Sequence, residues 1–346
     1  MSNKSKESLK YQSYKRFKEM ADRGIGTSKF QDEQKAKAEY ERLKSQGVRM
    51  RMTKQEYVNE AKRPKIYSYE TLNGYQRNSK NFIDWTRARY KGEDGRTFKQ
   101  IDQLKPYIED YLKYGMEKGW TPHTLHTRRS ALCKLYQISS KDLNIELPER
   151  KSSNITRSRH DCEHDKYFDK EKYGDLEIVC NGTGARREDL MKFIKEDFKQ
   201  WQGEPYMTRV PNGRDSNGKM RYIEKPVLKD GDYYLHVRQG KGGKERYIPI
   251  IPDALPTVRE YFEKAKAGER VFTDIPKKMD VHSYRRNYSK VLYKLHERPL
   301  DEIPRHEKYF GRKESKGIVY DKHAMAVVTT ALGHNRLNVI ANNYLK

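Results

Sequence analysis

The sequence is poor in apolar residues, which narrows the classes of protein that it could encode. Only 34% of its 346 residues are hydrophobic, and no apolar run approaches the roughly 18 residues that span a bilayer. The first ten residues lack the apolar core of a signal peptide. A membrane protein and a secreted protein are therefore not expected, and we predict a cytoplasmic chain.

Cysteine is also scarce. Cys133, Cys162 and Cys180 form an odd, scattered set that does not suggest a disulfide framework. His160 and His164 flank Cys162 at alternate positions, but no second pair of ligands follows at the spacing of a zinc finger. Neither disulfides nor a metal site is expected.

Acidic residues are too few to balance the basic ones. The chain has 73 Lys and Arg against 49 Asp and Glu, a net charge of +24. Such an excess is the electrostatic footprint of a partner rich in phosphate, and nucleic acid is the first candidate. The length allows two domains and a small N-terminal module, because single cores seldom grow much beyond 250 to 300 residues.

Residues 1–65 contain three short helical patterns with weakly apolar faces. They begin near Leu9, after Ser28, and at Thr53, where Glu56 completes a capping box. A basic segment of this kind is either an arm that contacts DNA or a solvated extension. The pattern does not decide between the two.

Residues 66–146 are predicted to form a helical domain. Apolar periodicity favours helices over Ser68–Tyr90 and Phe98–Gly119, and Thr121 with Pro122 begins a third helix that reaches Ile138. The third helix is expected to expose a basic face made of Arg128, Arg129 and Lys134. The same pattern would fit a plain helical bundle with solvated charges.

The polar stretch 147–165 is interpreted as a linker, and 166–346 as a second domain. Helices are expected at 169–179 and 187–198. Tyr233–Gln239 and Arg246–Ile250 read as two strands joined by a turn at Gly240–Gly243. The predicted fold class is mainly α with a small β-hairpin or sheet, that is α+β.

Two glycine-containing turns in this domain each carry a basic residue that could contact phosphate. Thr183-Gly184-Ala185 places Arg186 at a helix start, where its guanidinium fork could grip two phosphate oxygens. Gly240–Arg246 carries Lys241 at a hairpin tip. It lacks the Gly-Lys-Ser/Thr ending of a nucleotide-binding P-loop, and a strand follows instead of a helix.

Three further patterns follow towards the C-terminus. His282 and Arg285 lie three residues apart and share a helix face. Leu332-Gly333 ends a helix just before His334, and Tyr344 lies on the next short helix. Because the chain has 26 tyrosines, Tyr344 is informative only through its position after the other patterns.

In this order, Arg, Lys, His-x-x-Arg, Gly-His and Tyr resemble the tyrosine recombinase family, which includes phage and conjugative-element integrases. The resemblance covers the chain from about Asp165 to its end, and more weakly Ser68–Ile138. It implies a mixed α/β catalytic domain behind a helical core-binding domain.

The resemblance also implies a mechanism and a set of catalytic residues. Tyr344 would attack a DNA phosphate and form a 3′-phosphotyrosyl link, with Arg186 and Arg285 as the cations on that phosphate. His282 and His334 would donate hydrogen bonds, and His282 is the one expected to take the tyrosine proton. Lys241 would protonate the departing 5′ oxygen. No cofactor is expected, neither ATP nor a metal ion, because one phosphoester is exchanged for another.

The implied partner is double-stranded DNA at specific sites, bound by a homotetramer assembled from monomers. Accessory directionality or DNA-bending proteins are possible partners, and a mobile element in the cytoplasm of a bacterial host would be inserted or excised. Around the catalytic residues, the basic side chains expected to contact DNA are Lys244, Arg246 and Arg286. A type IB topoisomerase and a non-catalytic DNA-binding relative remain alternatives.

Three departures from the family pattern are visible. His282 and His334 are 52 positions apart, and residues 297–322 between them form an apparent insert with a strand candidate at Gly317–Tyr320. We predict a small hairpin or lobe there. The spacing from His334 to Tyr344 is 10, about one longer than is common in the family. Because two residues follow Tyr344, exchange of a C-terminal segment between protomers is not expected.

Overall fold

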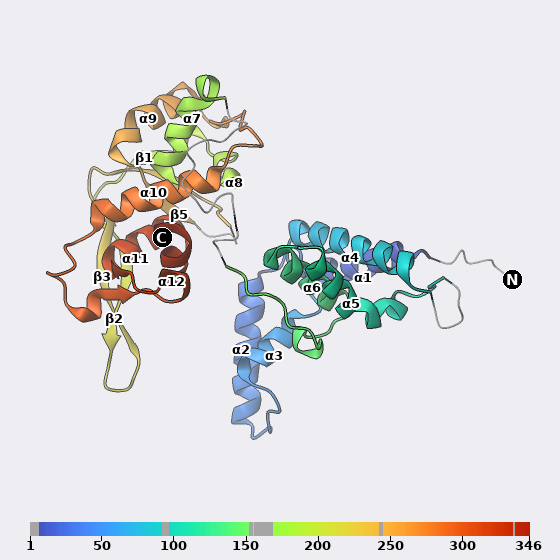
Figure 1. Cartoon of the computed structure of the whole chain (residues 1–346). Helices are drawn as coiled ribbons and strands as arrows, with labels where there is room; N and C mark the ends of the chain where they lie inside the picture. Colours follow the sequence, from blue (N-terminus) through green and yellow to red (C-terminus); the bar gives the residue numbers. More distant parts are fainter. Residues whose placement is uncertain (1–6, 92–96, 152–154, 156–168, 242–244, 335) are drawn as a thin grey trace. The chain divides into compact units, whose positions relative to one another are not determined.

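The chain folds into two units with separate apolar cores. A computed structural model describes residues 7–91, 97–151, 155, 169–241, 245–334 and 336–346 (Figure 1). Contacts divide the chain into Met1–Arg150 and Lys151–Lys346. The secondary structure is mainly helical with small antiparallel sheets, so the predicted fold class is confirmed. Among the described residues, no helix has both the length and the apolar character needed to cross a bilayer.

The described part of the first unit is helical, and its helices begin where the sequence offers caps. Thr53 and Glu56 form the predicted capping box, and Thr121 accepts from the backbone N–H of Thr124 with Pro122 in the first turn. The helices are α1 Leu9–Gly24, α2 Lys29–Ser45, α3 Lys54–Lys62, α4 Tyr69–Arg89, α5 Ile108–Glu117 and α6 Pro122–Leu135, with a 3-10 segment Ile101–Tyr107 before α5.

Helix α1 packs into the same core as the later helices of this unit. Phe17 of α1, Phe82 of α4 and Leu132 of α6 are fully buried in one cluster. The hydroxyls of Ser13 and Ser79 share a buried hydrogen bond of 2.8 Å between α1 and α4. The domain boundaries predicted near residues 65 and 147 remain predictions, but α1 has no core apart from that of α4 and α6.

The second unit surrounds one core with helices and three small sheets. Its helices are α7 Lys170–Thr183, α8 Arg187–Leu190, α9 Leu255–Lys264, α10 Val281–His296, α11 Lys322–Ala331 and α12 Leu337–Ile340, followed by a π-helical turn Ala341–Leu345. Its strands are β1 Phe198–Gln200, β2 Tyr206–Arg214, β3 Met220–Leu228, β4 Tyr233–Val237, β5 Arg246–Pro249, β6 Lys308–Phe310 and β7 Val319–Asp321.

The sheets are antiparallel and include one hairpin that the sequence did not predict. The order β1-β4-β5 contains the predicted hairpin, with Leu235 opposite Ile248. Strands β2 and β3 form a long separate hairpin (Figure 1). The helix predicted over 187–198 is wrong beyond Leu190. Residue Ile194 bridges to Arg270 instead, a tertiary pairing that the local pattern does not encode.

The insert 297–322 forms a small hairpin, as predicted, from β6 and β7. A charged network holds its base. Arg298 donates to both Asp321 carboxylate oxygens at 2.8 Å and to Glu307 at 2.6 Å. The Asp321 side chain is fully buried and also accepts from the backbone N–H of His323, which caps α11. Arg298 therefore joins the insert to the helix behind it.

Arg298→Ala is expected to lower the free energy of unfolding by about 3 kcal/mol, because it leaves the buried Asp321 carboxylate without its charge partner. Urea denaturation measures the change. Arg305→Ala is the control, since within the described ranges this guanidinium lies only on the exposed Phe310 ring, and its effect should stay within about 0.5 kcal/mol. A loss below about 1 kcal/mol for Arg298→Ala would contradict the role given to Arg298.

Candidate active site

Arg285 is the most deeply buried cation of the second unit. Asp280 caps α10 by accepting from the backbone N–H of Ser283, and one turn later the Arg285 side chain enters the core with 0% exposure. Its guanidinium donates to the carbonyl of Gly184, and to the carbonyl of Leu332 at 2.5 Å. Burial lowers the pKa of Arg285 to about 10, so the group stays charged at neutral pH.

The turn that carries Arg186 lies directly against α10. Gly184 ends α7 with φ +56°, a backbone conformation that favours glycine. A Cβ at this position would also lie 2.3 Å from the Tyr288 ring, so the lack of space requires glycine as well. Arg186 follows as the N-cap of α8, and its backbone N–H donates to Asp189 at 2.9 Å. This close approach brings the Arg186 side chain towards Arg285.

Arg186 and Arg285 converge on one oxygen atom. The carbonyl of Leu332, at the C-terminal end of α11, accepts from Arg186 at 2.9 Å and from Arg285 at 2.5 Å. A helix-end carbonyl oxygen carries partial negative charge, because it lies at the negative end of the helix dipole. Two guanidinium groups around one neutral oxygen form a site that a phosphate would fill more strongly.

A third guanidinium, that of Arg246, lies close to this pair. Arg246 of β5 is 3% exposed and forms a buried ion pair with Asp189. Its side chain passes under Gly333, where φ is +66° and an added Cβ would lie 3.1 Å from the Arg246 Cδ. Burial lowers the pKa of Arg246 while the Asp189 carboxylate opposes that shift. The glycine of the Gly-His motif therefore allows the chain to pass over Arg246.

His334 and Tyr344 form the candidate reactive pair beside the guanidinium groups. The His334 Nε2 lies 3.3 Å from the Tyr344 hydroxyl, and the two ring centroids are 5.4 Å apart. The Arg285 Cζ lies 6.0 Å from the centre of the Tyr344 ring. Burial lowers the pKa of His334 to about 3, and Arg285, Arg186, Arg246 and Lys241 add to the effect. His334 is therefore neutral at pH 7 and a weaker base than a free imidazole.

The structure thus brings together Arg186, Arg285, His334 and Tyr344. Lys241 is exposed at the tip between β4 and β5, near enough to His334 to influence its pKa. His282 is exposed in the first turn of α10. The sequence pointed to His282 as the group that takes the tyrosine proton, and this role stays a prediction. The structure places the His334 Nε2 3.3 Å from the Tyr344 hydroxyl.

The basic face predicted for the first unit is not exposed as expected. The Arg128 guanidinium lies 3.6 Å from the centre of the Trp120 ring. Lys134 is half-buried and donates to the carbonyl of Arg63 at 2.5 Å, and burial lowers its pKa to about 8. Both side chains serve packing inside the unit. Contact of the half-buried Arg129 with DNA stays a prediction.

Two of the three predicted DNA contacts near the catalytic residues are also buried. Arg246 pairs with Asp189, as described above, and is a structural support instead of a surface contact. Arg286 is 8% exposed and donates to the backbone carbonyl of Lys346. Lys244 lies outside the described residues. Burial of these two guanidinium groups depends on partners 57 and 60 positions away, which local patterns do not reveal.

Comparison with known proteins finds similarity only at the level of structure. No family model and no curated protein matches the chain. A XerH site-specific recombinase bound to difH substrate shares 15% identity over 98% of this chain and 92% of its own, with a TM-score of 0.44. The Tn1549 transposon integrase in complex with transposon right end DNA shares 12% identity over 80% and 89%, with a TM-score of 0.39.

These are recombination enzymes on DNA. They are the kind of protein that the order of the motifs resembles.

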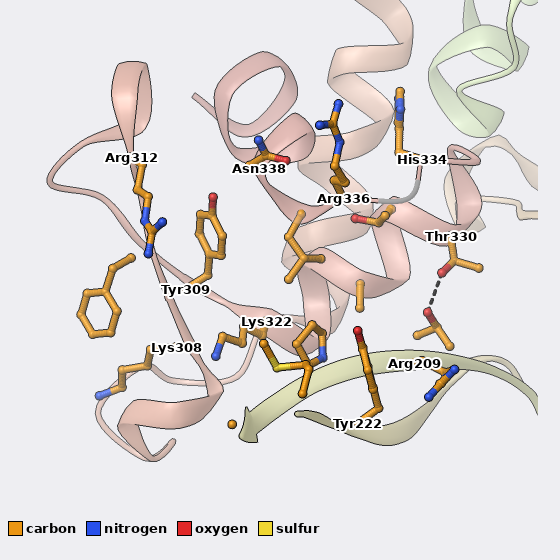
Figure 2. A pocket seen from close by; sticks show the side chains of 18 of the residues that line it. Arg209, Tyr222, Lys308, Tyr309, Arg312, Lys322, Thr330, His334, Arg336 and Asn338 are labelled. Carbon is orange, nitrogen blue, oxygen red and sulfur yellow. Dashed lines mark hydrogen bonds between the residues drawn. The ribbon is translucent and has the colours of Figure 1, made fainter. Parts of the chain in front are cut away.

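Sequence reasoning missed a basic cleft beside His334. It has a volume of about 1220 Å³ and lies between the β2–β3 hairpin, the insert and the C-terminal helices (Figure 2). Within the described residues, no group of three or more metal-binding side chains occurs.

The β2–β3 hairpin of this cleft was missed because its polar and apolar residues do not alternate regularly. The alternation is interrupted by Pro211, Gly213 and Pro226. The opposite charges of Arg209 and Glu224, which lie across from each other in this hairpin, were the signal in the sequence that could have indicated it.

The lowered pKa of His334 has a consequence for stability. An unfolded histidine takes up a proton below about pH 6.5, whereas folded His334 does not until near pH 3. Stability contributed by neutral His334 is therefore complete above pH 6.5 and is lost as the pH falls.

Between pH 7.5 and 5, the free energy of unfolding of the wild-type chain should fall by about 2 kcal/mol more than that of His334→Asn. Urea denaturation at both pH values measures the difference. An identical pH dependence in the two chains would show that His334 protonates normally in the folded state.

Proposed function

We propose that this chain is a site-specific DNA recombinase that cuts and rejoins strands through a phosphotyrosyl bond at Tyr344. One observation carries the proposal: two guanidinium groups meet at a single oxygen, the Leu332 carbonyl, next to a tyrosine whose hydroxyl contacts a neutral imidazole. Cations fixed in advance around a phosphate stabilise the extra charge that develops on its oxygens in the transition state.

The reaction needs only side chains of this site. The Tyr344 hydroxyl gives its proton to a general base, for which we propose His282, as its oxygen forms a bond to phosphorus. The bond from phosphorus to the 5′ oxygen breaks, and Lys241 gives that oxygen a proton. Arg186 and Arg285 hold the nonbridging oxygens, and the neutral His334 donates a hydrogen bond to them. Attack by a second 5′ hydroxyl reverses these steps and joins a new strand.

The larger biological setting belongs to the same proposal. The order of the motifs supports a recombinase that inserts or excises a mobile element, with protomers assembling as a tetramer on two duplex sites. Because a phosphoester is exchanged for another phosphoester, the step does not require ATP or a metal ion. The net charge of +24 supports duplex DNA as the substrate.

Covalent capture on nicked DNA tests the proposal. A pool of nicked duplexes with randomised sequence traps a phosphotyrosyl enzyme, because the short fragment beyond the cut is lost and religation cannot occur. After denaturation, the proposal predicts DNA that stays on the protein and is enriched in one sequence. Absence of covalent DNA would overturn it. Covalent DNA without sequence enrichment would instead favour relaxation of DNA by a topoisomerase.

A further inference from the structure

The basic cleft beside His334 has the chemistry of a binding site for a polyanion. Seven of its 21 lining residues are Lys or Arg, and none is Asp or Glu. The seven are Arg209, Arg214, Lys308, Arg312, Lys313, Lys322 and Arg336. Figure 2 shows several of them on the two sides of the cleft, with Arg209 on the hairpin and Lys308 and Arg312 on the insert.

Several cations that line the cleft have no carboxylate partner in the described part of the chain. Among the described residues, no ion pair includes Arg209, Arg312 or Arg336. Glu224 lies opposite Arg209 in the hairpin but does not line the cleft. Arg298 in the same insert is instead held by two carboxylates. Like charges gathered without partners repel one another, so an anionic ligand would bind here with a net gain.

Exposed aromatic rings accompany these cations. Tyr222 is 47% exposed, and the Arg209 Cζ lies 4.4 Å from the centre of its ring. Phe310 is 45% exposed, with the Arg305 Cζ 5.0 Å from its ring centre. Arg and aromatic planes of this kind stack on nucleic-acid bases. The base faces of a duplex are already covered by their neighbours, so such rings favour an unpaired strand.

The walls of the cleft are held in place before any ligand arrives. The hydroxyls of Thr208 and Thr330 share a hydrogen bond of 2.6 Å that joins the hairpin to α11, drawn as a dashed line in Figure 2. Arg298 holds the insert, as described above. Lys313 on the cleft wall has φ +57°, a conformation that non-glycine residues seldom adopt and that concentrates at functional sites.

One end of the cleft reaches the reactive pair. His334 lines it, and the same ring contacts the Tyr344 hydroxyl. A strand whose phosphate lies at Tyr344 can therefore continue into the cleft. We infer that the cleft binds an unpaired segment of the DNA strand next to the phosphate that Tyr344 attacks. This inference rests on the proposed function and assigns the β2–β3 hairpin and the insert to holding that strand.

Binding of labelled oligonucleotides to the full chain, measured by fluorescence anisotropy, tests the inference. Tyr222→Leu with Phe310→Leu should weaken binding of a single-stranded thymidine oligonucleotide at least about tenfold, because each stacked base loses its aromatic partner. Binding of a duplex of the same length should change less than about twofold. Phe30→Leu with Tyr69→Leu is the matched control, since these rings are 69% and 68% exposed in the other unit.

Two outcomes would overturn the inference: unchanged single-strand binding in the cleft variant, or an equal loss for duplex and single strand, which would make the cleft a duplex contact. Because the assay requires no chemistry, its failure is separable from failure of the proposed function. A chain that forms covalent DNA but shows no single-strand effect refutes only the cleft. A chain with the single-strand effect but no covalent DNA refutes only the strand-cutting activity.

Discussion

Tyr344→Phe is expected to bind DNA as the wild-type chain does and to form covalent complexes at least about 10³-fold more slowly. The substitution removes only the hydroxyl oxygen, and the ring that packs beside His334 and Arg285 remains. The basic surface that attracts DNA is unchanged, so binding and chemistry should separate. Electrophoresis under denaturing conditions after incubation with nicked duplex measures the covalent complex, and gel shift under native conditions measures binding.

Tyr320→Phe is the matched control for this experiment. Its ring is buried in the same unit, and its hydroxyl has no hydrogen-bond partner among the described residues. Loss of that hydroxyl should leave covalent complex formation within about twofold of wild type. Wild-type levels of covalent complex in Tyr344→Phe would exclude Tyr344 as the nucleophile.

Arg285→Lys is expected to slow strand cleavage by about 10²- to 10³-fold while DNA affinity changes only a few-fold. Lysine keeps the positive charge but cannot donate to two oxygens from a planar fork. The guanidinium of Arg285 now reaches two carbonyls, those of Gly184 and Leu332. Phosphate binding in the transition state needs this same two-sided contact beside Arg186.

Burial of Arg285 makes a stability control necessary for this variant. Single-turnover cleavage should be measured at a temperature where circular dichroism shows the variant to be folded. Arg259→Lys supplies the comparison, because its guanidinium lies over the Tyr233 ring away from the carbonyl of Leu332, and it should cleave at the wild-type rate. Cleavage by Arg285→Lys within about threefold of wild type would show that Arg285 has no role beyond charge.

Local signals predicted the elements whose ends are set by neighbouring residues. The caps at Thr53 and Thr121 formed because each hydroxyl accepts from a backbone N–H only three residues further along the chain. The hairpin that carries Lys241 followed from alternating residues around a glycine turn. Motif order likewise singled out residues that the fold brings to one place, since Arg186 and Arg285 both reach the Leu332 carbonyl.

What the sequence could not predict depends on partners far along the chain. Arg246 and Lys134 read as surface cations, but Asp189 and the carbonyl of Arg63 draw them into the fold. The direct contact of His334 with the Tyr344 hydroxyl was also not predicted, and the assignment of the proton acceptor to His282 stays a prediction. A charged side chain shows its burial only through such contacts, which are absent from any short window of sequence.

The most direct test is to identify the residue that carries DNA after cleavage. Covalent complexes formed on nicked duplex can be digested with protease and nuclease, and the peptides sequenced by mass spectrometry. We predict that a nucleotide is attached to the peptide that contains Tyr344, through the phenolic oxygen. Attachment to any other residue, for example Tyr309 or Tyr222 in the neighbouring cleft, would contradict the assignment of this site.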